Sequence, residues 1–165
     1  MRAALLALAF VLPVVAGCLQ GDPPTPASDA MAVPWSFTDT EGIVRSANGS
    51  AGKPTLLFFM ATWCSTCKSK SPMLKNVAEA YAGRVNVYSV SVDETDTDGK
   101  LEAWREAREH PWPHGRAGEM TKAFGVRLQS TFVLLSAEGE VLRKWDYPGA
   151  SEEDLRGSLE KALSG

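Results

Sequence analysis

Hydrophobic and polar positions first settle into regular patterns near Val33. Residues 55–61 form a continuously apolar run of strand length, which is typical of a central strand covered on both faces. Residues 85–92 alternate apolar and polar positions and predict a second strand. Between them we expect a helix over residues 65–81, with Pro72 kinking it. Together these segments predict a βαβ unit.

The flanking segments add shorter elements to this unit. "FTDTEG" followed by "IVRS" predicts an N-terminal hairpin, and "STFVLLS" with "VLRKWDY" predicts a second hairpin around the turn "AEGE". "LEAWREAREH" and "GEMTKAF" predict helices. A last helix should begin at Ser151 as its N-cap, with Asp154 completing a capping box and Leu155 and Leu159 on its apolar face. The predicted order is hairpin, βαβ, helices, ββα.

The N-terminal stretch has a different pattern. Residues 1–17 carry one positive charge, at Arg2, followed by apolar or small residues, and they predict a secretory signal peptide. "VAGC", ending at Cys18, resembles the lipobox of prokaryotic lipoproteins, which implies cleavage before Cys18 and a diacylglycerol on its thiol. An ordinary signal peptide that contains a cysteine, or an uncleaved anchor, is the alternative.

The proline-rich residues 18–32 then predict a semi-rigid tether, and residues 33–165 a folded domain. The expected location is the extracytoplasmic face of a prokaryotic membrane, where the domain is held by a lipid anchor. This compartment is oxidising, so a dithiol there is not kept reduced by cytosolic systems.

Composition excludes several classes of protein. Lys and Arg number 17 against 20 Asp and Glu, and no basic run is present, so we expect no nucleic-acid partner. A hydrophobic fraction of 44% is sufficient for a packed core. Three cysteines are too few for a disulfide scaffold, so their chemistry should be local.

Cys64 and Cys67 follow the apolar run directly and fall at the predicted start of a helix. Unpaired N–H groups and the helix dipole there favour a thiolate at Cys64, which is the nucleophilic form, and Cys67 lies one turn along. A structural disulfide is an alternative, although so short a loop gains little entropy. We expect Trp63 to form a flat apolar rim beside an exposed Cys64 sulfur.

A metal site is the other interpretation of the two cysteines. Zinc would need two further ligands, for which only His110 and His114 remain, and "HPWPH" does not place them on one helical face. Both histidines are therefore expected in a loop. "DETDTDGK" imitates the start of a calcium loop, but Arg105 stands where the last ligand should be, so we expect an acidic loop that caps the next helix. No metal and no cofactor are predicted.

At this point the residues resemble a known family. "GKPTLLFFMATWCSTC" is similar to the thioredoxin superfamily, and "VPWSFTDTEG", "SVDET" and "FGV" resemble its TlpA/ResA-like membrane-anchored thiol–disulfide oxidoreductases. The resemblance implies a thioredoxin-like α/β fold: a central mixed sheet, helices on both faces and an extra N-terminal hairpin. It implies that Cys64 attacks and Cys67 resolves. It also implies protein thiols or disulfides as substrates, a membrane redox partner, and a role in cytochrome c or copper-site maturation.

The chain departs from the family pattern at three positions. Phe58 stands where many thioredoxins have a buried acid, Lys70 where many relatives have a glutamate, and Ser130 where the superfamily has a cis-proline. We expect Lys68 and Lys70 to lower the pKa of Cys64. Trp63, Ser130 and Thr131 are expected to contact substrate. The Gln129–Ser130 peptide should be trans, because a cis bond before a non-proline residue costs about 2.5–4 kcal/mol.

Three further functions compete with a disulfide exchanger. A metallochaperone like the copper-binding Sco proteins would have three residues between its cysteines and a histidine near Ser130, and this chain has neither. A tethered binding module would use the same fold with an incidental dithiol. A thiol peroxidase fits the Cys-x-x-Cys junction less well.

Overall fold

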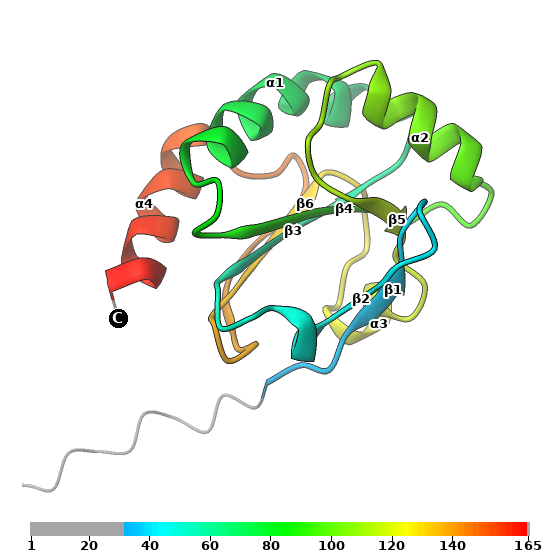
Figure 1. Ribbon diagram of the computed structural model, residues 1–165. Coiled ribbons are helices and arrows are strands. Elements are labelled where there is room, and N and C mark those ends of the chain that lie inside the picture. Colours follow the sequence, from blue (N-terminus) through cyan, green and yellow to red (C-terminus); the bar gives the residue numbers. More distant parts are fainter. Residues whose placement is uncertain (1–31, 165) are drawn as a thin grey trace, which may run out of the picture.

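A five-stranded sheet with the order β5-β4-β3-β6-β7 organises residues 32–164, the part of the chain that the computed structural model describes (Figure 1). A separate two-stranded sheet, β1-β2, packs beside it. The elements in chain order are β1 (Ser36–Thr38), β2 (Val44–Ser46), the 3-10 helix η1 (Ala47–Gly49), β3 (Thr55–Met60), α1 (Ser65–Ala80), β4 (Asn86–Ser91), α2 (Asp98–Glu106), β5 (His114–Arg116), α3 (Met120–Ala123), β6 (Thr131–Leu135), β7 (Val141–Trp145) and α4 (Glu152–Ser164).

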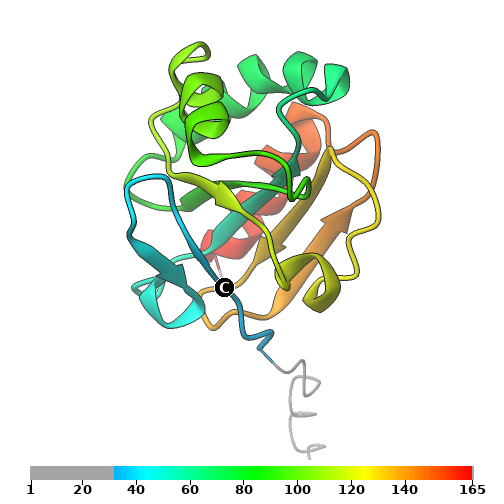
Figure 2. The same cartoon turned by 90° about the vertical axis from the view of Figure 1, so that its right-hand side faces the viewer.

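The central strand is β3, as the apolar run predicts. It runs parallel to β4 and antiparallel to β6, and all six of its residues are buried. The sheet is therefore mixed. Because side chains alternate along a strand, β3 supplies two cores. Leu56 and Phe58 face a cluster that includes residues of α1, α2 and α4, whereas Leu57 and Phe59 face residues of the β1–β2 hairpin and α3. Figures 1 and 2 show these layers on opposite faces of the sheet.

Both predicted hairpins and the C-terminal cap are confirmed. β1 pairs with β2 and β6 with β7, each antiparallel. The backbone N–H of Asp154 donates to Ser151 Oγ at 3.1 Å, and that of Ser151 donates to Asp154 Oδ2 at 3.0 Å, so the capping box is complete. Pro72 lies inside α1, where its missing N–H removes one intrahelical hydrogen bond.

The predicted bounds of one helix and the predicted loop position of His114 are wrong. Helix α2 begins at Asp98 and ends at Glu106, ahead of the segment 101–110 that periodicity selects, because the Thr97 side chain accepts the backbone N–H of Lys100 and starts the helix earlier. His114 is not a loop residue but begins β5, which pairs parallel with β4. A strand of three residues is too short to show a pattern in the sequence.

The predicted signal peptide, the lipidated Cys18 and the proline-rich tether lie outside the described residues. Between residues 32 and 164, no helix has the length and apolar character needed to cross a membrane.

Candidate redox site

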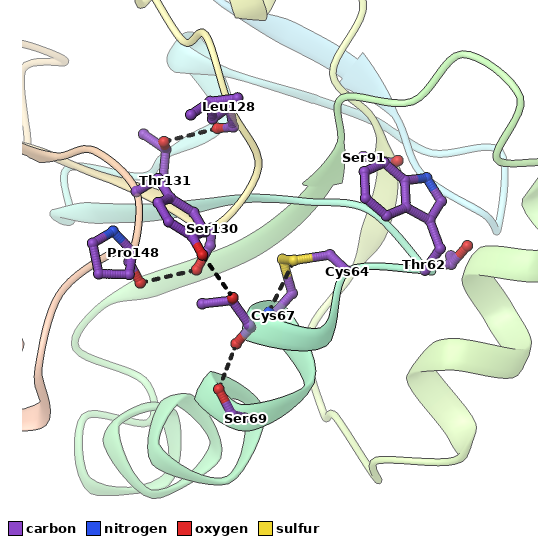
Figure 3. Close-up of a disulfide and its surroundings, with 12 residues drawn as sticks. Thr62, Cys64, Cys67, Ser69, Ser91, Leu128, Ser130, Thr131 and Pro148 are labelled. Atoms are coloured by element: carbon purple, nitrogen blue, oxygen red, sulfur yellow. Dashed lines mark hydrogen bonds between the residues drawn. A yellow bond between two sulfur atoms is a disulfide. The ribbon is translucent and has the colours of Figure 1, made fainter.

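Cys64 and Cys67 form a disulfide where β3 leads into α1 (Figure 3). Cys64 is the N-cap of α1, and its sulfur accepts the backbone N–H of Cys67 at 3.0 Å. The expectation of an exposed sulfur is wrong: Cys64 is 3% exposed and Cys67 is fully buried. Both pack into the core cluster on the α1 side of the sheet. A partner must therefore approach Cys64 over its immediate rim.

This position is suited to thiolate chemistry. The first turn of α1 presents backbone N–H groups that have no partner within the helix, and the Cys67 N–H already points at the Cys64 sulfur. The same groups and the helix dipole stabilise negative charge on that sulfur when the disulfide opens. The geometry therefore favours Cys64 as the more acidic thiol of the pair.

The rim of the site is aromatic and apolar. Trp63 is 60% exposed, as expected, and Leu128 and Tyr147 are also large exposed side chains. The Tyr147 hydroxyl lies 3.4 Å from Thr66 Oγ1 in the first turn of α1, so this ring stands next to the dithiol. A cavity of about 470 Å³ extends from it and is lined by Gly125, Arg127, Leu128, Lys144, Asp146 and Tyr147.

Ser130 and Thr131 lie across from the disulfide, fully buried (Figure 3). Ser130 adopts a φ of 63°, and its hydroxyl donates to the carbonyl of Pro148 at 3.1 Å. The Gln129–Ser130 bond is trans as predicted, since Tyr147–Pro148 is the only cis bond in residues 32–164. A Cβ at Gly149 would meet the Ser130 carbonyl oxygen at 2.6 Å, so the two segments approach each other closely only with glycine there.

The two lysines that should tune Cys64 occupy different settings. Lys68 is exposed on α1. The Lys70 ammonium donates to the carbonyl of Ala150 at 2.8 Å, so it is held against the segment that precedes α4. An influence of either charge on the pKa of Cys64 remains a prediction.

Asp96 is a buried carboxylate that sequence reasoning overlooked. It accepts the backbone N–H of Thr62 at 2.9 Å and the hydroxyls of Thr62 at 2.5 Å and Ser91 at 2.6 Å. Asp96 thereby fixes the loop between β3 and Cys64. The signal was available, because parallel strands β3 and β4 end at the same edge and bring "SVDETD" beside "ATWC".

Asp93 holds the exposed Trp63 in place. Its carboxylate accepts the indole N–H at 2.5 Å, and this bond, followed by those from Thr95, lowers the pKa of Asp93 below its ordinary value. The acidic loop was expected only to cap the next helix, a role that Thr97 performs. Two of its aspartates instead position Thr62 and Trp63, the two residues that directly precede Cys64.

His110 lies in a loop, as predicted, whereas His114 begins β5, and both side chains are buried. His110 Nε2 lies 2.5 Å from Ser71 Oγ on α1, and His110 Nδ1 lies 3.1 Å from His114 Nε2. Desolvation lowers the pKa of His110 to about 4 and that of His114 well below its usual range. The alternation of "HPWPH" could have indicated this, since extended backbone directs His110, Trp112 and His114 to one side. Residues 32–164 contain no cluster of three side chains of the metal-ligating types His, Cys, Asp and Glu.

Fold and site together define a thioredoxin-like protein with a Cys-x-x-Cys disulfide at a strand-to-helix junction. The AhpC/TSA family matches residues 28–144, so the chain belongs to this family of thioredoxin-like proteins. The thiol-disulfide oxidoreductase ResA of Bacillus thuringiensis subsp. konkukian is 28% identical over 108 residues, which are 65% of this chain and 62% of ResA. These matches confirm the TlpA/ResA-like resemblance. The chain thus spans less than two thirds of the length of that relative.

Solved structures share the fold. A secreted Mycobacterium tuberculosis disulfide oxidoreductase homologous to Escherichia coli DsbE superposes with a TM-score of 0.67 at 21% identity, covering 82% of this chain and 99% of that one. The pneumococcal exposed lipoprotein thioredoxin from Streptococcus pneumoniae strain TIGR4 gives 0.67 at 18% identity, covering 78% and 98%. They confirm a thioredoxin-like fold.

Proposed function

We propose that the protein is a thiol–disulfide oxidoreductase that exchanges its Cys64–Cys67 disulfide or dithiol with cysteines of other proteins. The observation that carries the proposal is the disulfide at the N-cap of α1, with its sulfur bonded to a backbone N–H and an exposed tryptophan beside it. Similarity to ResA supports the same activity. No metal or cofactor is needed for this exchange.

The exchange runs through a mixed disulfide. The Cys64 thiolate attacks one sulfur of a substrate disulfide, forms a bond to it and releases the other substrate sulfur as a thiolate. The Cys67 thiolate then attacks the Cys64 sulfur, which restores the internal disulfide and releases the second substrate sulfur. Two electrons pass to the substrate, whose sulfurs take up the two protons that Cys64 and Cys67 lost. The reverse sequence oxidises a substrate dithiol.

We further propose that Trp63, Ser130 and Thr131 contact the substrate around the mixed disulfide. Trp63 is exposed beside Cys64, and its indole is fixed by Asp93. Ser130 and Thr131 lie across from the sulfurs, and their hydroxyls bond to the carbonyls of Pro148 and Leu128. Both residues are fully buried, so they would contact a substrate only once docking displaces the residues that cover them.

The proposed location is the extracytoplasmic face of a membrane, with Cys18 lipidated and the domain held on the tether of residues 18–32. The "VAGC" sequence supports this, and two proteins of the same fold are described as secreted and as an exposed lipoprotein. Substrates would then be protein cysteines near the membrane, including those of cytochrome c or copper sites. A membrane redox partner would restore the dithiol.

Insulin reduction by the full chain with dithiothreitol tests the activity. Cys64→Ser should abolish turnover, and Cys67→Ser should trap mixed disulfides that dithiothreitol releases, whereas Ser69→Ala on the exposed side of α1 should match the parent. Turnover by Cys64→Ser at the parent rate would contradict the proposal. Peroxide consumption that depends on Cys64 without insulin reduction would instead indicate a thiol peroxidase.

Cys18→Ser tests the anchor separately. This variant should leave the membrane fraction of expressing cells and keep the insulin-reducing activity of the parent. Membrane association that survives the substitution would contradict lipid attachment at Cys18.

A further inference from the structure

Three buried polar side chains, Ser71, His110 and His114, form a hydrogen-bond chain from α1 to the first residue of β5. Ser71 Oγ lies 2.5 Å from His110 Nε2, and His110 Nδ1 lies 3.1 Å from His114 Nε2. Trp112 stacks on the His110 ring with 4.1 Å between centroids and is itself fixed by donating to Ser89 Oγ at 2.8 Å. The rings are thus held in place.

The Ser71 end of this chain lies one helical turn beyond Cys67. Residues four apart on a helix project from the same face, with Cβ atoms about 5–6 Å apart. Ser71 is 3% exposed and Cys67 is 0% exposed, so both side chains point into the interior. The Ser71 hydroxyl is therefore a polar group next to the buried sulfur.

The Cys67 sulfur needs such a group whenever the disulfide opens. Its thiolate forms without contact with solvent, and a buried anion without a hydrogen bond is strongly disfavoured. The sheet supplies no hydrogen-bond donor at Phe58, because this side chain is an aromatic ring that stacks on Phe132 with 4.4 Å between centroids. Asp96 already accepts hydrogen bonds from Thr62 and Ser91, and as a carboxylate it would repel a thiolate.

The number of protons on Ser71, His110 and His114 fixes the direction of the hydrogen bonds between them. With both histidines neutral, the three groups carry three protons for two mutual hydrogen bonds, so one proton always projects from an end. At the far end His114 Nδ1 is buried and has no partner among the described residues, so a proton there would be an unsatisfied donor. At the near end the extra proton lies on the Ser71 hydroxyl, in the turn that follows Cys67.

The surrounding charges keep both histidines neutral. Burial lowers the pKa of each, and the cations Lys75 and Arg108 lower that of His110 further, while Arg105 and Arg108 do so for His114. Glu109 is paired with Lys75 at 2.7 Å, and its side chain is exposed. The three-proton count therefore holds at neutral pH.

Building on the proposed disulfide exchange, we propose that Ser71 donates a hydrogen bond to the Cys67 thiolate, with His110 and His114 as positioning residues. His114 Nε2–H donates to His110 Nδ1, His110 Nε2–H donates to Ser71 Oγ, and the Ser71 proton points at the sulfur. The Cys67 thiolate then attacks the Cys64 sulfur, and the departing substrate sulfur receives the electron pair and a proton from solvent. Ser71 keeps its proton throughout.

The acidity of Cys67 tests the proposal. In full-length Cys64→Ser, the pH dependence of iodoacetamide labelling of the Cys67 peptide is followed by mass spectrometry, which separates it from Cys18. Ser71→Ala should raise the midpoint by about one pH unit, a tenfold loss of thiolate at a given pH. Ser71→Thr keeps a hydroxyl and should retain the parent midpoint. His110→Phe keeps the stacking and should raise the midpoint by less.

Ser69→Ala is the matched control, because it removes an exposed hydroxyl of the same helix that donates to the Thr66 carbonyl. Its midpoint should equal that of the parent. Coincident profiles for Ser71→Ala and the parent, with unchanged circular dichroism, would overturn the proposal, as would an equal shift in Ser69→Ala. The titration requires no turnover. Failure of the unmodified protein to reduce insulin would therefore count against the proposed function alone.

Discussion

Two buried polar clusters flank the start of α1, and they are satisfied to different degrees. On one side, the Asp96 carboxylate accepts three hydrogen bonds, two from Thr62 and one from Ser91. On the other, the chain from Ser71 through His110 ends at His114 Nδ1, which has no partner within the described part of the protein. Each cluster includes one residue close to the dithiol in sequence: Thr62, two positions before Cys64, and Ser71, four positions after Cys67.

The difference separates a structural support from a hydrogen-bond donor. A carboxylate with three donors has one stable arrangement, and it clamps the loop that leads into Cys64. The hydrogen-bond chain of Ser71, His110 and His114 has three protons for two links, and the proton left over lies on the Ser71 hydroxyl. We infer that Asp96 determines where the dithiol lies, whereas the Ser71–His110–His114 chain supplies a hydrogen-bond donor to its charge.

The largest effect should come from removing the Asp96 carboxylate, which accepts hydrogen bonds from Thr62 and Ser91. Asp96→Ala leaves the Thr62 N–H and the hydroxyls of Thr62 and Ser91 without their acceptor. The free energy of unfolding should therefore fall by roughly 3–5 kcal/mol, since each unsatisfied donor costs about 1–3 kcal/mol. Urea unfolding followed by circular dichroism measures it. Glu94→Ala, at an exposed position of the same loop, is the control and should stay within about 0.5 kcal/mol of the parent. Equal stability of the two variants would show that Asp96 is not a clamp.

The histidine chain should make stability depend on pH. The unfolded chain binds protons at its histidines near 6.5, whereas folded His110 does so only near 4, so the unfolded state holds more protons between these values. The free energy of unfolding is therefore highest above pH 6.5. It should fall by roughly 3 kcal/mol as the pH drops to 4, and protonation of His114 adds to the loss. Urea unfolding at successive pH values measures the slope.

His110→Gln keeps a hydrogen-bonding side chain but does not titrate, so its slope between pH 6.5 and 4.5 should be shallower than that of the parent. This window also avoids the carboxylates with lowered pKa values, Asp93, Glu102, Glu109 and Asp154, whose contribution is lost only at lower pH. Parallel slopes would mean that His110 is protonated in the folded protein.

The smallest effect should come from changing Trp63, the exposed residue next to Thr62. Trp63→Phe removes the indole N–H that bonds to Asp93, the first cause of the lowered pKa of that carboxyl. The pKa of Asp93 should rise towards its ordinary value in an NMR titration, with little change in stability because the pair is exposed. An unchanged Asp93 pKa would assign the shift to Thr95.

Local patterns predicted much of this architecture. The buried run of β3, both hairpins and the capping box at Ser151 depend on neighbouring residues, and each is found in the structure. Helix α2 was misplaced because its start depends on one side chain, Thr97, and β5 was missed because its place depends on pairing with β4.

Local patterns predicted the site only where its residues are adjacent in sequence, and Ser130 and Thr131 were found through the family resemblance instead. Cys64 and Cys67 follow from their spacing and their position before a helix. Asp96 and the histidines act across 34 and 39 residues, on Thr62 and Ser71 respectively. Such contacts require the parallel pairing of β3 with β4 and the packing of the segment before β5 beneath α1. The predicted βαβ unit implies the parallel pairing, but no local pattern encodes the packing beneath α1.

The central place of β3 has a consequence for synthesis of the chain. Its partner β4 follows after one helix, but Thr55 also pairs with Leu135, near the end of the domain. Until β6 has been made, β3, which is apolar from Leu56 to Met60, has one edge without hydrogen-bond partners. Open edges of this kind promote association between nascent chains. We therefore expect chains that stop before β6 to aggregate more readily than chains that include it, in which the last hairpin covers this edge of β3.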